Sequence, residues 1–202
     1  MKLYYTKSSP FARKVLINSI EAGVFESLDL INLSKSGTFQ LPKNFDKINP
    51  LFKIPALEIK NDDIIIDSPV ICEYLDFISV QRKLLPTDIA EKFFQLKLQA
   101  LADGLMEAAV LRRYESLREP HQQSHEFDSK QLQKINATLN YFNNHVGFLK
   151  TPYMIGEVAI MCAIGYLDYR FPHETWRSEN PNLEKWFKLA QQWLPFQSTQ
   201  PG

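Results

Sequence analysis

The hydrophobic pattern of this 202-residue chain changes once, near residues 81–86, and that change restricts the folds open to it. Before this point, short strand patterns alternate with amphipathic helix patterns. After it, apolar residues recur three and four positions apart, as in helices packed on one another. The sequence therefore predicts a small sheet covered by helices, followed by an all-helical region. We expect domains at residues 1–79 and 88–202, joined by a linker at 80–87.

The first region predicts the order β-α-β, an irregular segment, and then β-β-α. The expected strands are residues 2–6, 28–33, 56–59 and 64–66. Residues 34–50 are polar, with short helices at most, and Lys60–Asp63 forms the turn of a hairpin between the last two strands. Both helices are expected to begin at a Ser-Pro pair, because serine is a favoured N-cap and proline is favoured at the first helical position. These pairs are Ser9-Pro10 and Ser68-Pro69, and Gly23 is expected to cap the end of the first helix.

Two apolar stripes mark the first helix of the second region. One stripe holds Ile89, Phe93, Leu96 and Ala100, and the other holds Phe94, Leu98, Leu101 and Leu105. Two stripes on one helix indicate burial on two sides, as at a domain or subunit interface. Similar periodicities at 132–146 and 183–193 predict two further helices.

Charge and composition argue against several classes of protein. Lysine plus arginine equals aspartate plus glutamate, so the formal net charge is zero and no global field draws nucleic acid or an anionic membrane. The longest apolar run, Val158–Leu167, is about half the length that a membrane-spanning helix needs. A cytoplasmic protein without nucleic-acid or membrane partners is expected. Cys72 and Cys162 lie in apolar stretches and are expected to be inert core residues.

Ser9 combines a structural role with a chemical one. Helix capping is the more common role of a Ser-Pro pair, but a capping oxygen accepts a backbone N–H and leaves the hydroxyl proton for a ligand. The positive end of the helix dipole favours an anion there. A thiolate would benefit, because a thiol with a pKa of about 8.5 becomes mostly ionised at neutral pH once its pKa falls by about two units. That shift takes roughly 2.7 kcal/mol, which one charge-assisted hydrogen bond and a helix N-terminus can supply.

Ile54-Pro55 and Asp67-Ser68 are the other two candidate binding features. A cis bond, which about 5–6% of X-Pro pairs adopt, would turn the backbone N–H and C=O of Ile54 outward toward a peptide-like ligand. Asp67-Ser68 offers a carboxylate, a hydroxyl and free N–H groups, which suit the ammonium and carboxylate of an amino acid. Its common structural role is again helix capping.

The order of these features resembles the N-terminal thioredoxin-like domain of glutathione transferases, and the helical remainder resembles their second domain. The phrase Ser-Pro-Phe-x-Arg-Lys at residues 9–14 is similar to a bacterial serine-type group of this family. Further similar segments are Leu84–Pro86, Ala102–Gly104, Cys162–Asp168 and Pro181–Trp186. The resemblance implies an α/β thioredoxin-like domain followed by an all-α C-terminal helical domain.

The resemblance also implies roles for five residues of the first region. Ser9 would donate a hydrogen bond to the sulfur of glutathione, which serves as co-substrate. Ile54 would pair through its backbone with the cysteinyl unit. Asp67 and Ser68 would bind the γ-glutamyl end, and Lys53 would face the glycine carboxylate.

The second substrate implied by the resemblance is a small hydrophobic electrophile, bound in a pocket between the domains. The expected lining residues are Phe11, Leu105, Arg112, Arg113 and Tyr114. The resemblance further implies a homodimer, in which Asp103 reaches the ligand of the partner subunit. It implies no metal.

The second region departs from the family pattern at Gly156-Glu157. Family members carry a Ser/Thr-x-x-Asp capping box shortly after such a pair, whereas Val158 follows directly here and about half a dozen residues are absent. A capping box satisfies backbone donors that are otherwise buried unpaired, worth about 1 kcal/mol or more. Glu157 is the residue placed to cap this helix instead.

A metal site and a serine hydrolase fit the sequence less well. His121 and His125, with Glu126 and Asp128 after them, could form half of a metal site, but Pro120 and the polar surroundings favour a solvated loop or helix start. The sequence contains no His-Glu-x-x-His, no glycine-rich phosphate loop and no Gly-x-Ser-x-Gly. A hydrolase at Ser9 would need a base, and the first region contains no histidine.

Two functions stay open at this point. One is a glutathione transferase, whose activated thiolate attacks an electrophile, although the same thiolate also serves isomerisation, peroxide reduction or dehalogenation. The other is a non-catalytic binding or regulatory protein with the same fold, like the stringent starvation proteins that bind RNA polymerase. A binding module needs no intact thiol site. The presence of Ser9, Ile54-Pro55 and Asp67-Ser68 together therefore favours the enzyme.

Overall fold

The protein is described from a computed structural model that places residues 1–35, 38–39, 41–60 and 63–202. Contacts between Cα atoms divide the chain into two compact units. The first unit is Met1–Ile89 together with Leu194–Gly202, and the second is Ala90–Trp193. The last residues therefore group with the sheet-containing unit, whereas the sequence pattern places them with the helices.

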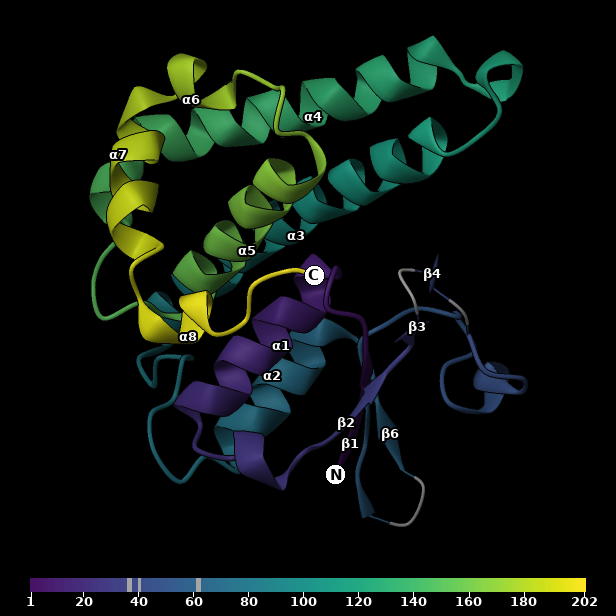
Figure 1. Cartoon of the computed structure of the whole chain (residues 1–202). Helices are drawn as coiled ribbons and strands as arrows, with labels where there is room; N and C mark the ends of the chain where they lie inside the picture. Colours follow the sequence, from purple (N-terminus) through teal and green to yellow (C-terminus); the bar gives the residue numbers. More distant parts are fainter. Residues whose placement is uncertain (36–37, 40, 61–62) are drawn as a thin grey trace. The chain divides into compact units, whose positions relative to one another are not determined.

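A four-stranded sheet forms the centre of the first unit (Figure 1). Its strands are β1 (Lys2–Tyr5), β2 (Asp29–Asn32), β5 (Ala56–Glu58) and β6 (Ile64–Ile65). Their spatial order is β2-β1-β5-β6, with β1 and β2 parallel and the other two pairs antiparallel. All four predicted strands are confirmed. The predicted turn at Lys60–Asp63 includes Asn61 and Asp62, which lie outside the described residues.

The prediction of an irregular segment at 34–50 is wrong in part. Two short strands, β3 (Ser34–Lys35) and β4 (Thr38–Phe39), pair antiparallel, with Ser34 opposite Phe39. Two-residue strands are too short to produce an alternating hydrophobic pattern, which explains why the sequence gives no sign of them. A 3-10 helix at Phe45–Lys47 agrees with the expected short helices.

Helix α1 (Pro10–Glu21) begins and ends as its sequence predicts. Ser9 is the N-cap, and its Oγ accepts the backbone N–H of Ala12 at 3.2 Å. At the other end Gly23 has a φ of 73°, and its N–H donates to the carbonyl of Ile20 while Val24 N–H donates to Ser19. This is a Schellman arrangement, which requires a left-handed residue and therefore favours glycine.

Helix α2 (Ser68–Phe77) begins one residue earlier than predicted. Asp67 is the N-cap position and Ser68 is already the first helical residue, so the prediction of Ser68 as N-cap is wrong. The Asp67 side chain forms no capping hydrogen bond; its backbone carbonyl accepts the N–H of Ile71. Proline is equally compatible with the second position of a helix, since the first-turn N–H groups have no partner within the helix.

Buried polar groups join α1 and α2 to neighbouring segments of the first unit. The carboxylate of Asp76, on α2, accepts hydrogen bonds from Asn18 Nδ2 at 3.1 Å and from the backbone N–H groups of Leu84 and Leu85 at 3.1 and 2.5 Å. Arg13, on α1, donates to the carbonyl of Phe196 at 2.7 Å, and its guanidinium lies 3.6 Å from the centre of the Phe196 ring. Phe196 belongs to α8 (Leu194–Gln197), which packs on α1.

The second unit is helical throughout its described length. Its helices are α3 (Ile89–Ser116), α4 (His125–Asn144), α5 (Ile155–Arg170), α6 (Trp176–Glu179) and α7 (Pro181–Ala190). Short 3-10 helices lie at Pro120–Gln122 and Val146–Phe148. Helix α5 is buried along nearly its whole length and is the centre of the unit. Within the described residues, no helix is both long and apolar enough to cross a membrane.

The two apolar stripes of α3 have different surroundings in the single chain. Leu98 and Leu105, from the second stripe, are 2% and 1% exposed. Ile89 and Phe93, from the first stripe, are 66% and 65% exposed. The predicted burial on two sides is therefore observed for the second stripe only.

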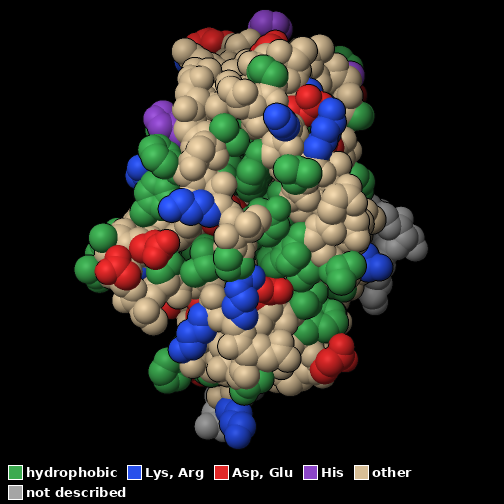
Figure 2. Space-filling view, turned by 90° about the vertical axis from the view of Figure 1, so that its left-hand side faces the viewer, with side chains coloured by type: hydrophobic (Ala, Val, Ile, Leu, Met, Phe, Trp, Pro, Cys, Tyr) green, Lys and Arg blue, Asp and Glu red, His purple; other side chains and the backbone are tan. Residues whose placement is uncertain are grey.

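Acidic and basic side chains are interspersed on the protein surface, as the face in Figure 2 shows. The ion pairs of the described residues have the same character, with lysines and arginines beside carboxylates, as in Lys2–Glu58 and Lys130–Glu126. Mixed charge agrees with the formal net charge of zero.

Helix α5 begins at a capping box formed by Met154 and Glu157, in place of the Ser/Thr-x-x-Asp box of the family pattern. The Glu157 carboxylate accepts the backbone N–H of Met154 at 3.0 Å, which confirms the capping role expected for Glu157. The side chain of Gln95, on α3, donates to Glu157 at 3.4 Å and accepts the Gly156 N–H at 2.9 Å. Glycine at 156 allows this close approach, because a Cβ there would lie 2.7 Å from Leu98 Cβ.

Replacing Glu157 with alanine is expected to lower the free energy of unfolding by about 1–3 kcal/mol, because the Met154 N–H loses its acceptor. Chemical denaturation measures the change. Glu157→Gln keeps an acceptor oxygen for the Met154 N–H and is the matched control, so it should keep most of the stability that Glu157→Ala loses. Equal destabilisation of both variants would contradict the capping role.

The pH dependence of stability gives a second readout for the same variants. Burial raises the pKa of Glu157, although hydrogen bonds from Met154, Gln95 and Lys150 oppose the shift. The native state therefore holds this proton more tightly than the unfolded state does. Wild-type stability relative to Glu157→Gln should decrease as pH rises from the ordinary glutamate pKa through the raised native pKa, and then stay constant.

Candidate functional site

Three connections of the first unit meet at one edge of its sheet. Tyr4 of β1 lies opposite Ala56 of β5 in an antiparallel pair, so β1 ends beside the beginning of β5. Leu57 of β5 lies opposite Ile65 of β6, also antiparallel, so β6 ends at the same edge. The segments that leave β1, enter β5 and leave β6 are therefore neighbours, although 40 or more residues separate the first from the others.

These segments carry the candidate residues of the first region. Ser9 follows β1, Lys53 and Ile54 precede β5, and Asp67 and Ser68 follow β6. Helices α1 and α2 begin at the same edge and pack along each other (Figure 1). Two helix N-termini, each with a partial positive charge and unpaired N–H groups, make this edge suitable for anionic groups.

Ser9 is half-buried, and its geometry fits both expected roles. Its oxygen accepts the Ala12 N–H, and its backbone N–H donates to the Thr6 carbonyl at 3.1 Å. These two bonds fix the position of the side chain at the N-terminus of α1. Since the oxygen acts only as acceptor in the cap, the hydroxyl proton is available to an anion.

Ile54 presents its backbone at the same edge. The Ile54–Pro55 peptide bond is cis, the form considered above for this X-Pro pair. Among the described residues, neither the N–H nor the C=O of Ile54 has a hydrogen-bond partner, and the residue lies outside β5. An unpaired N–H and C=O of this kind can bind a peptide-like ligand in the manner of an added strand.

Asn49 holds the loop before Ile54, and the sequence reading missed it. The side chain is 2% exposed; its Nδ2 donates to the Lys53 carbonyl at 2.8 Å, and its Oδ1 accepts the Leu51 N–H at 2.9 Å. One amide therefore fixes both ends of a short loop. Asparagine before proline is a turn signal, and this pair, Asn49-Pro50, is the feature that could have identified it.

Asp67 and Ser68 differ in their exposure to solvent. The Asp67 carboxylate is exposed and has no hydrogen bond among the described residues, whereas Ser68 is 2% exposed. Pro69 has no N–H, so the first-turn donors of α2 are those of Ser68 and Val70. A free carboxylate beside free N–H groups matches the ammonium and carboxylate of an amino acid.

The residues expected to line an electrophile pocket differ in accessibility. Phe11, on α1, is half-buried, and the other four lie on α3. Leu105 is 1% exposed and belongs to the core, whereas Arg113 is half-buried and Tyr114 is 57% exposed. Asp103 is half-exposed on the same helix.

Arg112 is held in an ion-pair cluster of the second unit. Its guanidinium contacts Asp128 at 2.9 Å and Glu174 at 2.6 Å and lies 4.7 Å from the centre of the Phe171 ring. Burial lowers the pKa of Arg112, but the two carboxylates outweigh burial and raise it. This geometry joins α3 to α4 and to the segment after α5, which is a structural role.

The histidines of the alternative metal site are exposed. His121 lies in a 3-10 helix, and His125 is the first residue of α4 with Ser124 as its N-cap. Within the described residues, no group of three or more histidine, cysteine, aspartate or glutamate side chains could hold a metal ion. Cys72 and Cys162 are both buried, and within the described residues neither forms a disulfide.

Comparison with known proteins gives consistent similarities. Residues 8–77 match the model of the glutathione S-transferase N-terminal domain. The uncharacterized GST-like protein YibF of Escherichia coli K12 is 35% identical over 192 residues, covering 92% of this chain and 91% of that protein.

Solved structures agree with this match. A glutathione transferase family member from Pseudomonas fluorescens Pf-5 with bound glutathione is 34% identical, with a TM-score of 0.92, and the alignment covers 100% of this chain and 98% of that chain. A structure from the same organism with bound S-(propanoic acid)-glutathione has a TM-score of 0.89 at 34% identity and full coverage of both chains. The four-stranded sheet of the first unit, the helices of the second unit and these matches together show that the chain belongs to the glutathione transferase family.

Proposed function

We propose that this protein is a glutathione transferase of the serine type, which binds glutathione in its first unit and activates the thiol as a thiolate for attack on a small electrophile. One observation carries the proposal: Ser9, Ile54 and Asp67-Ser68, distant in sequence, lie at one sheet edge where two helices begin. Relatives with 34% identity bind glutathione and a glutathione conjugate, which supports the same ligand here.

Each candidate residue has a role that its geometry supports. The Ser9 hydroxyl donates to the glutathione sulfur, and the N-terminus of α1 adds a favourable dipole. The Ile54 backbone pairs with the cysteinyl unit, and the exposed Lys53 ammonium faces the glycine carboxylate. Asp67 binds the γ-glutamyl ammonium, while Ser68 and the first N–H groups of α2 bind its carboxylate.

We further propose that the protein acts as a homodimer. The exposed stripe of α3, with Ile89 and Phe93, supplies apolar surface for a second copy, and exposed clusters of this kind mark interaction sites. Asp103, on the same helix, would then reach the glutathione of the partner subunit. Sedimentation measures the oligomeric state, and a monomer at micromolar concentration would rule out this part of the proposal.

Binding to immobilised glutathione, followed by conjugation of chlorodinitrobenzene and a broad panel of electrophiles, tests the main proposal. Retention together with catalysed conjugation is expected. Retention without any conjugation favours a non-catalytic binding protein with this fold. Absence of both overturns the proposed function.

Asn49→Ala is expected to raise the dissociation constant for glutathione about 5- to 30-fold, because the Lys53 carbonyl and Leu51 N–H lose their partners and Ile54 is no longer held in place. Asn49→Asp is the matched control, since it keeps the acceptor for Leu51 and loses only the donor to Lys53. Calorimetric titration with glutathione gives both constants. If binding is unchanged while the variant stays folded, Asn49 does not position Ile54.

A further inference from the structure

A cavity of about 440 Å³ lies in the first unit, at the C-terminal end of α1. Its volume falls within the range of about 300–1,000 Å³ that is typical of small-molecule sites. Ser9 caps the opposite end of this helix, roughly 16 Å away at about 1.5 Å per residue. The cavity is therefore separate from the candidate glutathione site. The residues that line it are Ile20, Gly23, Phe25, Glu26, Gln81, Ser198 and Thr199.

The walls of the cavity are attached to α1. The backbone N–H of Arg82 donates to the Glu21 carbonyl at 3.0 Å, which holds the segment that carries Gln81 against the end of the helix. The Gln81 side chain lies over Gly23, 2.7 Å from the position that a Cβ would take there. Phe25–Ser27 forms a 3-10 helix directly after this turn. The cavity is thus formed before a ligand enters, which lowers the cost of ordering its walls on binding.

The polar groups that line the cavity are mainly hydrogen-bond acceptors. Ser198 Oγ donates its proton to the Pro195 carbonyl at 3.2 Å, and Thr199 Oγ1 donates to the same carbonyl at 2.9 Å. A hydroxyl has a single proton, so both oxygens offer a ligand only lone pairs. The exposed Glu26 carboxylate is also an acceptor, and no hydrogen bond or ion pair from the described residues occupies it. A ligand that fits these groups must donate hydrogen bonds.

The charge around the cavity favours a cation. Among the lining residues, Glu26 alone is charged, and the C-terminal end of α1 adds a partial negative charge. The neighbouring Arg82 is paired with Glu21. Arg13 donates to Thr199 Oγ1 at 3.4 Å, but it is 4% exposed and does not line the cavity.

Apolar side chains form the rest of the lining. Ile20 and Phe25 are both half-buried, so each presents part of its side chain to a ligand. An aromatic ring also attracts an ammonium group placed over its face. The combination of acceptors, one carboxylate and apolar surface matches an ammonium group attached to an apolar body.

We propose that this cavity is a binding site for a primary amine with an apolar body. The ammonium donates to Glu26 and to the oxygens of Ser198 and Thr199, while the apolar body packs on Ile20 and Phe25. The site goes beyond the proposed transferase function and does not rest on it.

Calorimetric titration with three indole compounds tests the ligand class. Tryptamine carries the ammonium, tryptophol replaces it with a hydroxyl, and indole-3-propionate carries a carboxylate. Tryptamine is expected to bind about tenfold more tightly than tryptophol, and indole-3-propionate more weakly than either. The proposal is overturned if tryptamine does not bind at millimolar concentration, or if either of the other compounds binds as tightly.

Glu26→Gln tests the position of the ammonium. The side chain keeps its shape and loses its charge, and an exposed residue of a 3-10 helix is a tolerant site for this change. Tryptamine affinity should fall about three- to tenfold, a modest loss because solvent screens an exposed carboxylate, while tryptophol affinity should stay the same. Unchanged tryptamine affinity in the folded variant would overturn the site.

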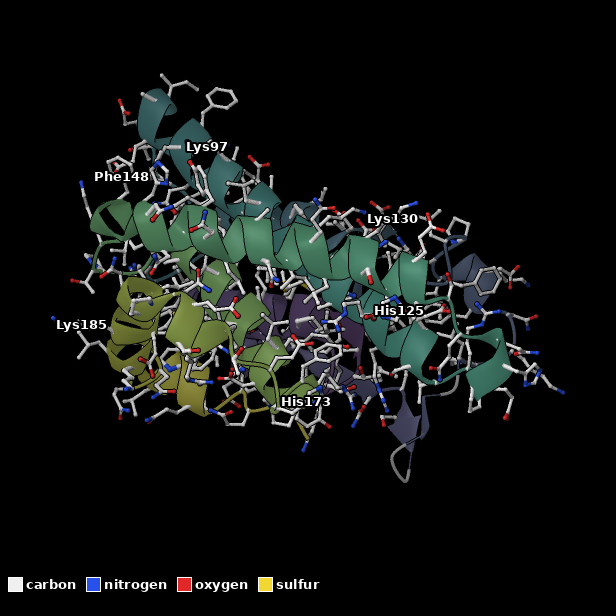
Figure 3. The ribbon with its side chains drawn as sticks, turned by 90° about the horizontal axis from the view of Figure 1, so that it is seen from above. Lys97, His125, Lys130, Phe148, His173 and Lys185 are labelled. Atoms are coloured by element: carbon white, nitrogen blue, oxygen red, sulfur yellow. The ribbon has the colours of Figure 1, made fainter. Side chains whose placement is uncertain are left out.

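Glu126→Gln is the control for loss of one negative charge. Glu126 is 79% exposed on α4 of the second unit and pairs with Lys130, which Figure 3 shows on this helix. Tryptamine affinity should be unchanged in this variant. An equal loss in Glu126→Gln and Glu26→Gln would mean that net charge alone attracts the amine, and the site would be overturned.

Titration of tryptamine in saturating glutathione separates this site from the proposed transferase site. The two ligands should bind together, because Ser9 and the cavity lie at opposite ends of α1. Displacement of tryptamine by glutathione would place the amine at the sheet edge, beside the Asp67 carboxylate, and would overturn the cavity as its site. If the protein binds tryptamine with the expected selectivity but no glutathione, the amine site stands and the transferase function is overturned.

Discussion

Replacing Ser9 with alanine is expected to raise the pKa of the bound glutathione thiol by about one to two units. The reason is the loss of the hydroxyl donor at the N-terminus of α1, since a hydrogen bond to a charged group is worth about 1.5–3 kcal/mol. At neutral pH the thiolate fraction, and with it the conjugation rate, should fall about three- to twenty-five-fold. Ultraviolet titration of the thiolate in the binary complex measures the pKa directly.

Two control variants separate this effect from loss of the helix cap. Alanine at an N-cap costs about 1 kcal/mol of stability, whereas glycine costs only a few tenths. Ser9→Gly and Ser9→Ala should therefore differ in stability but raise the thiol pKa equally. Ser8→Ala removes a neighbouring hydroxyl that contacts Thr6 at 3.5 Å and should leave the thiol pKa unchanged. An unaltered titration in Ser9→Gly would exclude Ser9 as the thiolate donor.

Asp76→Ala is expected to lower the free energy of unfolding by about 3–5 kcal/mol, which corresponds to a decrease in melting temperature of about 6–20 °C for a chain of this size. The Asp76 carboxylate is 4% exposed and accepts from Asn18, Leu84 and Leu85. Alanine would leave all three donors buried without an acceptor. No other residue described here serves as acceptor for both backbone N–H groups.

Asp76→Asn is the matched control for shape. It keeps one carbonyl oxygen and should lose roughly half as much stability, because at least one backbone N–H remains paired. Thermal and denaturant unfolding of both variants gives the comparison. A loss below about 1 kcal/mol in Asp76→Ala would show that water replaces the carboxylate and that Asp76 does not hold the segment before α3.

The order of elements could be predicted from the sequence because each leaves a local signal. The Ser-Pro pairs indicate helix starts, and Gly23 indicates a helix end, since these effects depend on a few neighbouring residues. Because these signals involve only neighbouring residues, they did not fix the first residue of α2. Ser68-Pro69 is compatible with either Asp67 or Ser68 as the N-cap. Strands β3 and β4 gave no signal because two residues do not define a period.

Side-chain partners from distant segments could not be predicted in this way. Asn49 and Arg112 both depend on atoms that the fold brings near them. Arg112 and Arg113 are adjacent in sequence, yet one is paired with two carboxylates and the other is not. Their difference follows from the side of α3 on which each lies, relative to the helices packed against it.

The docking of α8 on α1 has a consequence for folding during synthesis. Residues 194–202 belong to the same unit as the sheet, and Phe196 accepts the hydrogen bond of Arg13, but roughly a hundred residues of the second unit are translated between them. At about 5–20 residues per second, the ribosome supplies Phe196 about 5–20 s after the first unit's other segments. The first unit therefore completes its core only when translation of the second unit has ended. The docking of α8 on α1 is then its last folding step, and it cannot occur before the whole second unit has been synthesised.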